Sequence, residues 1–169
     1  MKNEITVKAF FLSIFLSIIL SSAMTYLGLY AGMTISASIP AAIMSMGILR
    51  LFKNSNILEN NIVQTAASAG ESLAAGVIFT LPALLLIGYW DTISYWEVTK
   101  IAMVGGILGA LFTVPLRRAL ILKARLRFPE GVATAAVLKT GHETDAKKSQ
   151  QSLKIIGISA LVGGFVKLG

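Results

Sequence analysis

The stretch from Ala9 to Leu49 contains no charged residue, although it is 41 residues long. A helix needs about 20 apolar residues to cross the hydrocarbon layer of a membrane, so this stretch is long enough for two crossings. Hydrophobic residues make up 55% of the chain and the mean hydropathy is +0.75, well above the composition of an ordinary water-soluble domain. The sequence therefore predicts an all-α integral membrane protein.

Apolar segments follow one another along the chain, and we expect about four transmembrane helices and the start of a fifth. Their expected bounds are 9–29, 31–49, 69–90, 101–116 and 153–169, and a polar cytoplasmic region covers 117–152. Because the last segment is shorter than a crossing requires, we expect it to be interrupted by the end of the chain. Some of these segments are candidates for broken or re-entrant helices.

The basic residues indicate how the chain is oriented. Of its 15 Lys and Arg, 13 lie at the N-terminus, in the 50–60 loop and in the 117–154 region. Basic loops stay on the cytoplasmic side, which predicts a cytoplasmic N-terminus in the cell (inner) membrane and an external aromatic loop at 89–97. Since the charges lie between apolar segments and form no stripe on a polar domain, the expected partner is the lipid bilayer and not nucleic acid.

The second apolar segment contains a proline among hydroxyl side chains. Pro40 is expected near the centre of this segment, where its missing N–H would open the helical hydrogen-bond ladder. Ser36 and Ser38 precede it and are candidates to line a polar path. Two interpretations stay open: a kinked packing helix whose hydroxyls bond their own backbone, or a broken helix at a substrate site.

Glu71 is a single carboxylate within an uncharged, small-residue run, TAASAGESLAAG. On one continuous helix it shares a face with Gln64 and Ser68. A charged side chain in lipid costs about 2.5 kcal/mol or more, so Glu71 should face protein or water, or be protonated. It is then a candidate for proton coupling or for binding a substrate ammonium group.

A second interpretation of Glu71 is purely structural. Ser68 and Glu71 match the S-x-x-E capping box, which would start a helix at Ala69. Running from there to Tyr89, that helix has 21 residues and is long enough to cross. Glu71 would then lie near the cytoplasmic start of the helix, a position that is compatible with either role.

The string FPEGVATAAVLKTG predicts a short helix. Pro129 suits the first helical position, Glu130 favours the positive N-terminus, and Gly141 suits the far end. About a dozen residues are too few to cross, so the helix either lies on the cytoplasmic surface or is a re-entrant half-helix.

The chain has no HExxH, Walker A or G-x-S-x-G motif, no cysteine and a single histidine. We therefore expect no enzyme activity, no metal site and no cofactor.

Three long strings resemble the oligopeptide transporter (OPT) superfamily, most closely its prokaryotic branch: YLGLYAGMTISASIPAAIMSMGILR, NNIVQTAASAGESLAAGVIFTLPALL, and VPLRRALI followed by FPEGVATAAVLKTG. The FPEGVATA string is also similar to an element of the plant yellow-stripe-like metal-chelate transporters in that superfamily. The positions that match are Asn61, Gln64, Thr65, Gly70, Glu71, Ser72, Pro129, Glu130 and Gly131.

The resemblance implies a proton-coupled secondary active transporter of oligopeptides or peptide-like solutes, with this chain as its N-terminal portion. Its partners would be protons, a small peptide and the missing C-terminal part of the same chain. The alternatives are a metal-chelate transporter of the same superfamily and a non-transporting truncated membrane module. The candidate substrate or proton-pathway residues are Glu71, Gln64, Ser68, Asn61, Thr65, Ser72, Ser36, Ser38, Pro40 and Glu130.

Overall fold

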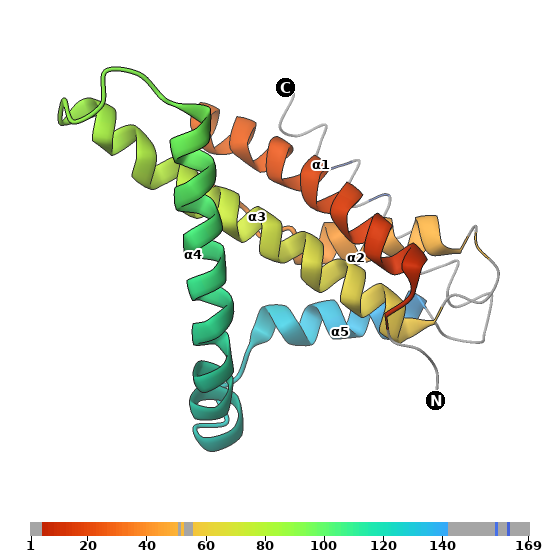
Figure 1. The fold of residues 1–169 in the computed structure, drawn as a ribbon. Helices are drawn as coiled ribbons and strands as arrows, with labels where there is room; N and C mark the ends of the chain where they lie inside the picture. Colours follow the sequence, from red (N-terminus) through yellow and green to blue (C-terminus); the bar gives the residue numbers. More distant parts are fainter. Residues whose placement is uncertain (1–4, 51, 53–55, 142–157, 159–161, 163–169) are drawn as a thin grey trace.

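The computed structural model describes residues 5–50, 52, 56–141, 158 and 162, and within these ranges every regular element is helical (Figure 1). The elements are α1 (Val7–Ala31), α2 (Ser38–Leu49), α3 (Ile57–Leu86), α4 (Tyr95–Leu116), the π-helical η1 (Arg117–Lys123) and α5 (Pro129–Gly141). The predicted all-α membrane class is confirmed. Apart from residues 158 and 162, the expected fifth segment at 153–169 lies outside the described residues, as does the 142–152 part of the expected cytoplasmic region.

Among the described residues, three helices are long and apolar enough to cross a membrane, one fewer than the four expected before residue 117. They are Val7–Ala31, Ile57–Leu86 and the continuous stretch Tyr95–Lys123, whereas Ser38–Leu49 is shorter. The difference arises in the second expected segment, which the structure divides.

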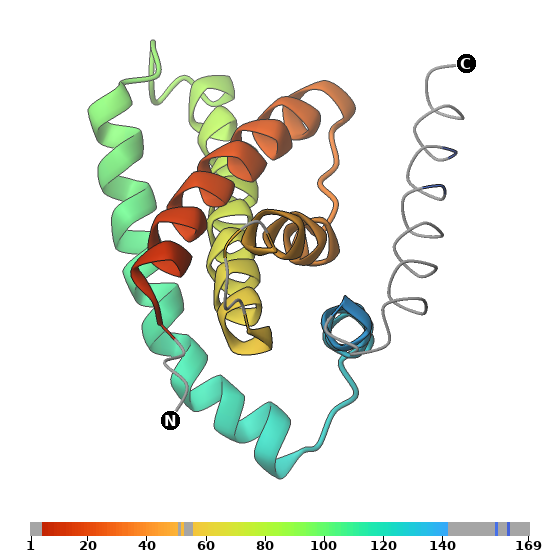
Figure 2. The same ribbon diagram turned by 90° about the vertical axis from the view of Figure 1, so that its right-hand side faces the viewer.

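Helices α1 and α3 lie side by side and run in the same direction (Figures 1 and 2). Small residues make this close approach possible. A Cβ atom added at Gly70 of α3 would lie 1.9 Å from Ser17 Oγ of α1, and one added at Gly28 would lie 3.3 Å from Ile78 Cγ2. Gly28 therefore lets α1 approach α3 closely, as small residues do between membrane helices.

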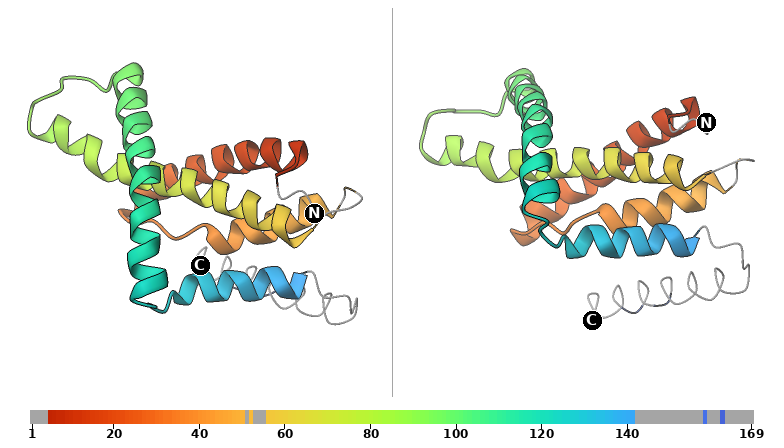
Figure 3. Two further views of the ribbon diagram at one scale, coloured as in Figure 1. Left: turned by 60° about the horizontal axis from the view of Figure 1, so that its bottom comes forward. Right: turned by 90° about the horizontal axis from the view of Figure 1, so that it is seen from below.

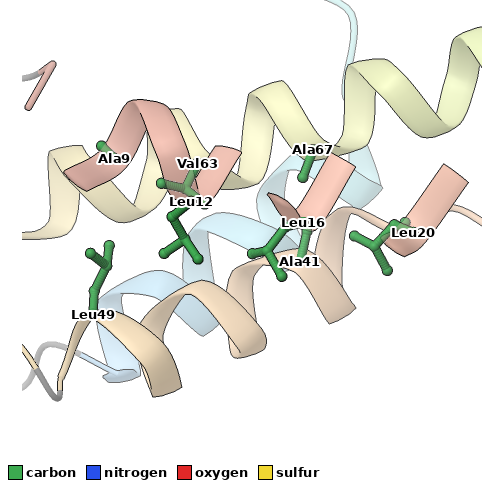
Figure 4. Close-up of a cluster of buried hydrophobic side chains, with 9 residues drawn as sticks. Ala9, Leu12, Leu16, Leu20, Ala41, Leu49, Val63 and Ala67 are labelled. Carbon is green, nitrogen blue, oxygen red and sulfur yellow. The ribbon is translucent and has the colours of Figure 1, made fainter. Parts of the chain in front are cut away.

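The core lies where α1, α2 and α3 meet (Figure 4). Leu12, Leu16 and Leu20 follow one face of α1 at helical spacing and are at most 9% exposed. Small residues oppose them, so that the three backbones can approach; the remaining members of the cluster are Ala9, Ala37, Ala41, Leu49, Val63 and Ala67.

The expectation of one crossing helix over 31–49, with Pro40 near its centre, is wrong. Helix α1 ends at Gly32, whose φ of 69° is the left-handed conformation that glycine adopts without strain. Residues 33–37 are not helical, and α2 begins only at Ser38. Pro40 therefore lies in the first turn of α2, where a missing N–H costs no hydrogen bond. The segment is therefore broken, as one of the two interpretations has it, but the break lies at residues 32–37, before Pro40.

The start of α3 also differs from the expectation. This helix begins at Ile57, and the capping box is formed by Asn56 and Glu59. Asn56 Oδ1 accepts from the Glu59 N–H at 2.9 Å, and Glu59 Oε2 accepts from the Asn56 N–H at 3.1 Å. Ser68 and Glu71 lie in the middle of the helix, so the capping box proposed at Ser68 is wrong.

Helices α2 and α5 are short, adjacent and parallel (Figure 3). They have 12 and 13 residues. At 1.5 Å per residue each is roughly 20 Å long, less than the hydrocarbon thickness of about 30 Å. The helix expected at Pro129–Gly141 is confirmed in its bounds, and it packs against α2 and α3. Helix α4 crosses these helices at a steep angle (Figure 3). Gly106 of α4 lies beside the Leu73 side chain of α3.

Candidate functional site

The first turns of α2 and α5 meet α3 halfway along its length. Glu71 lies at the midpoint of the 30 residues of α3. Ser38, the first residue of α2, places its Oγ 3.0 Å from Ser68 Oγ of α3. Glu130, in the first turn of α5, accepts a hydrogen bond from the Ser36 hydroxyl. Two helix N-termini therefore converge on the centre of a long apolar helix.

Glu71 itself is 3% exposed and lies against the start of α2. Its carboxylate accepts a hydrogen bond from the backbone N–H of Ala37, which is the N-cap residue of α2. A helix N-terminus carries unsatisfied N–H groups and a partial positive charge, both of which stabilise a carboxylate. The broken helix thus supplies the partner that lets Glu71 be buried.

The serines connect the two carboxylates into one polar cluster. Ser36 Oγ, beside the Glu130 carboxylate, lies 3.2 Å from Ser38 Oγ and accepts from the Ser38 N–H at 3.4 Å. Ser38 in turn reaches Ser68, one turn before Glu71 on α3. Glu71 and Glu130 are also close enough for their charges to interact. We call Ser36, Ser38, Ser68, Glu71 and Glu130 the junction cluster.

The structure thus brings together five of the ten predicted site residues, contributed by α2, α3, α5 and the non-helical segment that precedes α2. Gln64 stands nearby, two turns before Glu71 on the same face of α3, and is 8% exposed. The shared face predicted for Gln64, Ser68 and Glu71 is therefore present.

Four other predicted residues lie outside the junction cluster. Thr65 is exposed and donates to the Asn61 carbonyl at 2.7 Å, while Asn61 and Ser72 are exposed on the same helix. Pro40 shapes the first turn of α2 and is also exposed. These four residues are not part of the cluster.

Sequence reasoning missed the backbone group that contacts Glu71. The Ala37 N–H has no side-chain signature, although hydroxyl residues followed by Pro40 are a recognised signal for a helix start. It also missed the contact between the C-terminal ends of α2 and α5, where a guanidinium nitrogen of Arg50 donates to the Gly141 carbonyl at 2.6 Å.

A buried polar pair was missed as well. Ser45 of α2 lies 3.1 Å from Asn60 Oδ1 of α3, and both residues are at most 1% exposed. Burial of this kind depends on which helices meet, so it is not visible in the sequence.

Long apolar helices together with interrupted shorter helices, whose N-termini meet at the middle of α3, define a helical membrane protein with discontinuous spans. The family comparison makes this assignment specific. The model of the family "OPT oligopeptide transporter protein" matches residues 4–168. The chain therefore belongs to the OPT oligopeptide transporter family, as its sequence strings predict.

A curated relative from Haemophilus influenzae, named "Putative oligopeptide transporter", is 46% identical over 131 residues. The match covers 78% of this chain and 20% of the relative, so the chain spans about a fifth of that protein's length. No solved structure matches the chain significantly.

Proposed function

We propose that this chain forms part of a secondary active transporter that carries oligopeptides or peptide-like solutes across the cell (inner) membrane, driven by protons. Family membership supports the transport of this class of solute. The observation that carries the proposal is the meeting of two half-helix N-termini with Glu71 at the middle of α3. In secondary transporters, binding sites near the bilayer centre are formed by such discontinuous helices.

Glu71 is the proposed coupling group. When it is ionised, it occupies the positive end of α2 through the Ala37 N–H. Protonation removes its charge and weakens that hydrogen bond, because charge-assisted hydrogen bonds are roughly twice as strong as neutral ones. The N-terminus of α2 then becomes available to another anionic group, such as the carboxylate of a peptide. Proton binding and substrate binding would be linked through this exchange.

Glu130 is the proposed contact for the other end of the substrate. It is exposed and lies within the same cluster, at the start of α5. A peptide ammonium group is complementary to this carboxylate, because their opposite charges attract each other. Gln64 and Ser68 would line the adjoining path on α3.

The experiment is Glu71→Gln in the complete gene product, which removes the charge and keeps the shape of the side chain. We expect loss of proton-driven peptide uptake with normal membrane insertion. Glu97→Gln is the matched control, because Glu97 is an exposed carboxylate in the first turn of α4. It should leave uptake unchanged.

Uptake by Glu71→Gln that is normal and still driven by a pH gradient would disprove the coupling role. Competition by unlabelled peptides and by metal chelates in the same assay separates the two solute classes of the superfamily. A chain that inserts but transports neither would favour the non-transporting module.

For the topology, we propose a cytoplasmic N-terminus. The starts of α1 and α3 lie on the same side of the bundle, and basic residues lie at both: Lys2 before α1 and Lys8 in its first turn, and Arg50 and Lys53 before α3.

A further inference from the structure

The two halves of α5 are held very differently. In its C-terminal half, Thr134, Leu138 and Gly141 are buried, and Leu138 packs with Ala42 and Met46 of α2. In its N-terminal half, all of residues 129–133 are exposed. The first turn of this helix is therefore held against the bundle by the polar contacts of Glu130 and not by an apolar core.

The C-terminal end makes a tight contact with α2. A Cβ atom added at Gly141 would lie 2.1 Å from Met46 Sδ and 3.0 Å from Met46 Cε. Beside it, Arg50 donates to the Gly141 carbonyl at 2.6 Å. Close packing and a charge-assisted hydrogen bond fix this end of α5 on the end of α2.

The segment that leads into α5 is irregular. The π-helical η1 follows α4, and residues 125–128 are exposed and not helical. Arg125 has a φ of 47°, a left-handed conformation that non-glycine residues adopt infrequently. Such interruptions absorb changes in backbone angle and are found at hinges.

We propose that the N-terminal half of α5 is a gate over the junction cluster, held closed by the hydrogen bond that the Ser36 hydroxyl donates to the Glu130 carboxylate. The gate pivots on the fixed end at Gly141, Met46 and Arg50. Residues 117–128 take up the change in backbone angles when the first turn moves away from α2. Opening would separate Glu130 from Ser36 and expose Ser38 and Ser68 behind it. The inference rests on the proposed function only in treating this cluster as the transport path.

The test measures access to the cluster without measuring transport, so its outcome is separate from that of the uptake experiment. A single reporter, Ser68→Cys, is introduced into a cysteine-free version of the complete gene product in membranes. Its reaction rate with a small water-soluble methanethiosulfonate reagent is then compared with and without Glu130→Ala. Ala67→Cys is the matched control reporter, because Ala67 is 0% exposed in the core between α1, α2 and α3.

We expect Glu130→Ala to accelerate labelling of Ser68→Cys by about tenfold or more, since hydrogen bonds to charged groups are among the stronger ones. Ala67→Cys should stay unreactive in both backgrounds. Lys139→Ala, on the exposed surface of the fixed half of α5, should leave the labelling rate unchanged.

An unchanged labelling rate of Ser68→Cys in Glu130→Ala overturns the gate. Equal acceleration at Ala67→Cys overturns it as well, because Glu130 would then hold the whole bundle together and not one end of α5.

Discussion

The contact between Gly70 and Ser17 sets the spacing of α1 and α3 beside Glu71, and replacing Gly70 by alanine probes it. The new Cβ would lie 1.9 Å from Ser17 Oγ and 3.2 Å from Ser17 Cβ. Rotation of the serine hydroxyl can relieve the first overlap. The second involves an atom fixed by the backbone of α1, so the helices must move apart by a few tenths of an ångström.

The magnitude follows from two opposing effects. Overpacking a close contact costs about 1–3 kcal/mol. Alanine in place of glycine within a helix gains about 1 kcal/mol through propensity. Gly70→Ala should therefore destabilise the protein by about 1 kcal/mol, and Gly70→Val by more, because a branched side chain adds further overlaps.

The assay is a double-mutant cycle with Ser17→Gly, followed by thermal unfolding of the complete gene product in detergent. Removing both Oγ and Cβ of Ser17 leaves 3.4 Å, to Ser21 Oγ, as the shortest distance to the new Cβ. We therefore expect Gly70→Ala to be nearly neutral in the Ser17→Gly background. If Gly70→Ala is neutral with Ser17 present, or equally destabilising without it, the close approach of α1 and α3 is refuted.

Two further predictions concern the helix ends. Asn56→Ala should lower the free energy of unfolding by about 1 kcal/mol, because it removes the capping box with Glu59. Asn61→Ala, on the exposed face of α3, should have little effect. Thermal unfolding of the two variants compares them, and equal losses of stability would contradict the cap. Arg50→Gln removes the charge-assisted hydrogen bond to the Gly141 carbonyl and should speed amide hydrogen exchange in the last turn of α5. Unchanged exchange there would show that the guanidinium does not hold this end.

Much of the fold could be predicted from local sequence. The uncharged run from Ala9 to Leu49 indicates membrane helices, and Pro129 marks the start of α5, where its fixed φ suits a helix and its missing N–H costs no hydrogen bond. These signals depend only on residue type and spacing.

Helix starts within apolar sequence were harder to predict, because S-x-x-E patterns also occur inside helices. Ser68 and Glu71 have the side chains of a capping box, but so do Asn56 and Glu59, and only the second pair lies where the helix begins. Alanine-rich sequence around Gly70 continues the helix through the first pair.

The candidate site was only partly predictable. Glu71 was recognised because a charged group in an apolar segment is uncommon, and Glu130 was recognised through the FPEG string that resembles the superfamily. Their proximity was not, since Ser36 and Glu130 are 94 residues apart in sequence. The Ala37 N–H that contacts Glu71 is a backbone group created by the break between α1 and α2, and no side chain marks it.

The central claim is that the start of α2 lies against the middle of α3, and disulfide cross-linking in membranes tests it most directly. Ser38→Cys with Ser68→Cys should cross-link readily under mild oxidation, because the two native Oγ atoms are 3.0 Å apart. Ser38→Cys with Thr80→Cys should not, because Thr80 is exposed and lies three turns beyond Ser68 on α3, about 18 Å away at 1.5 Å per residue. Efficient cross-linking of the first pair alone is the predicted result; no cross-link at Ser68, or an equal yield at Thr80, would contradict the convergence at Glu71.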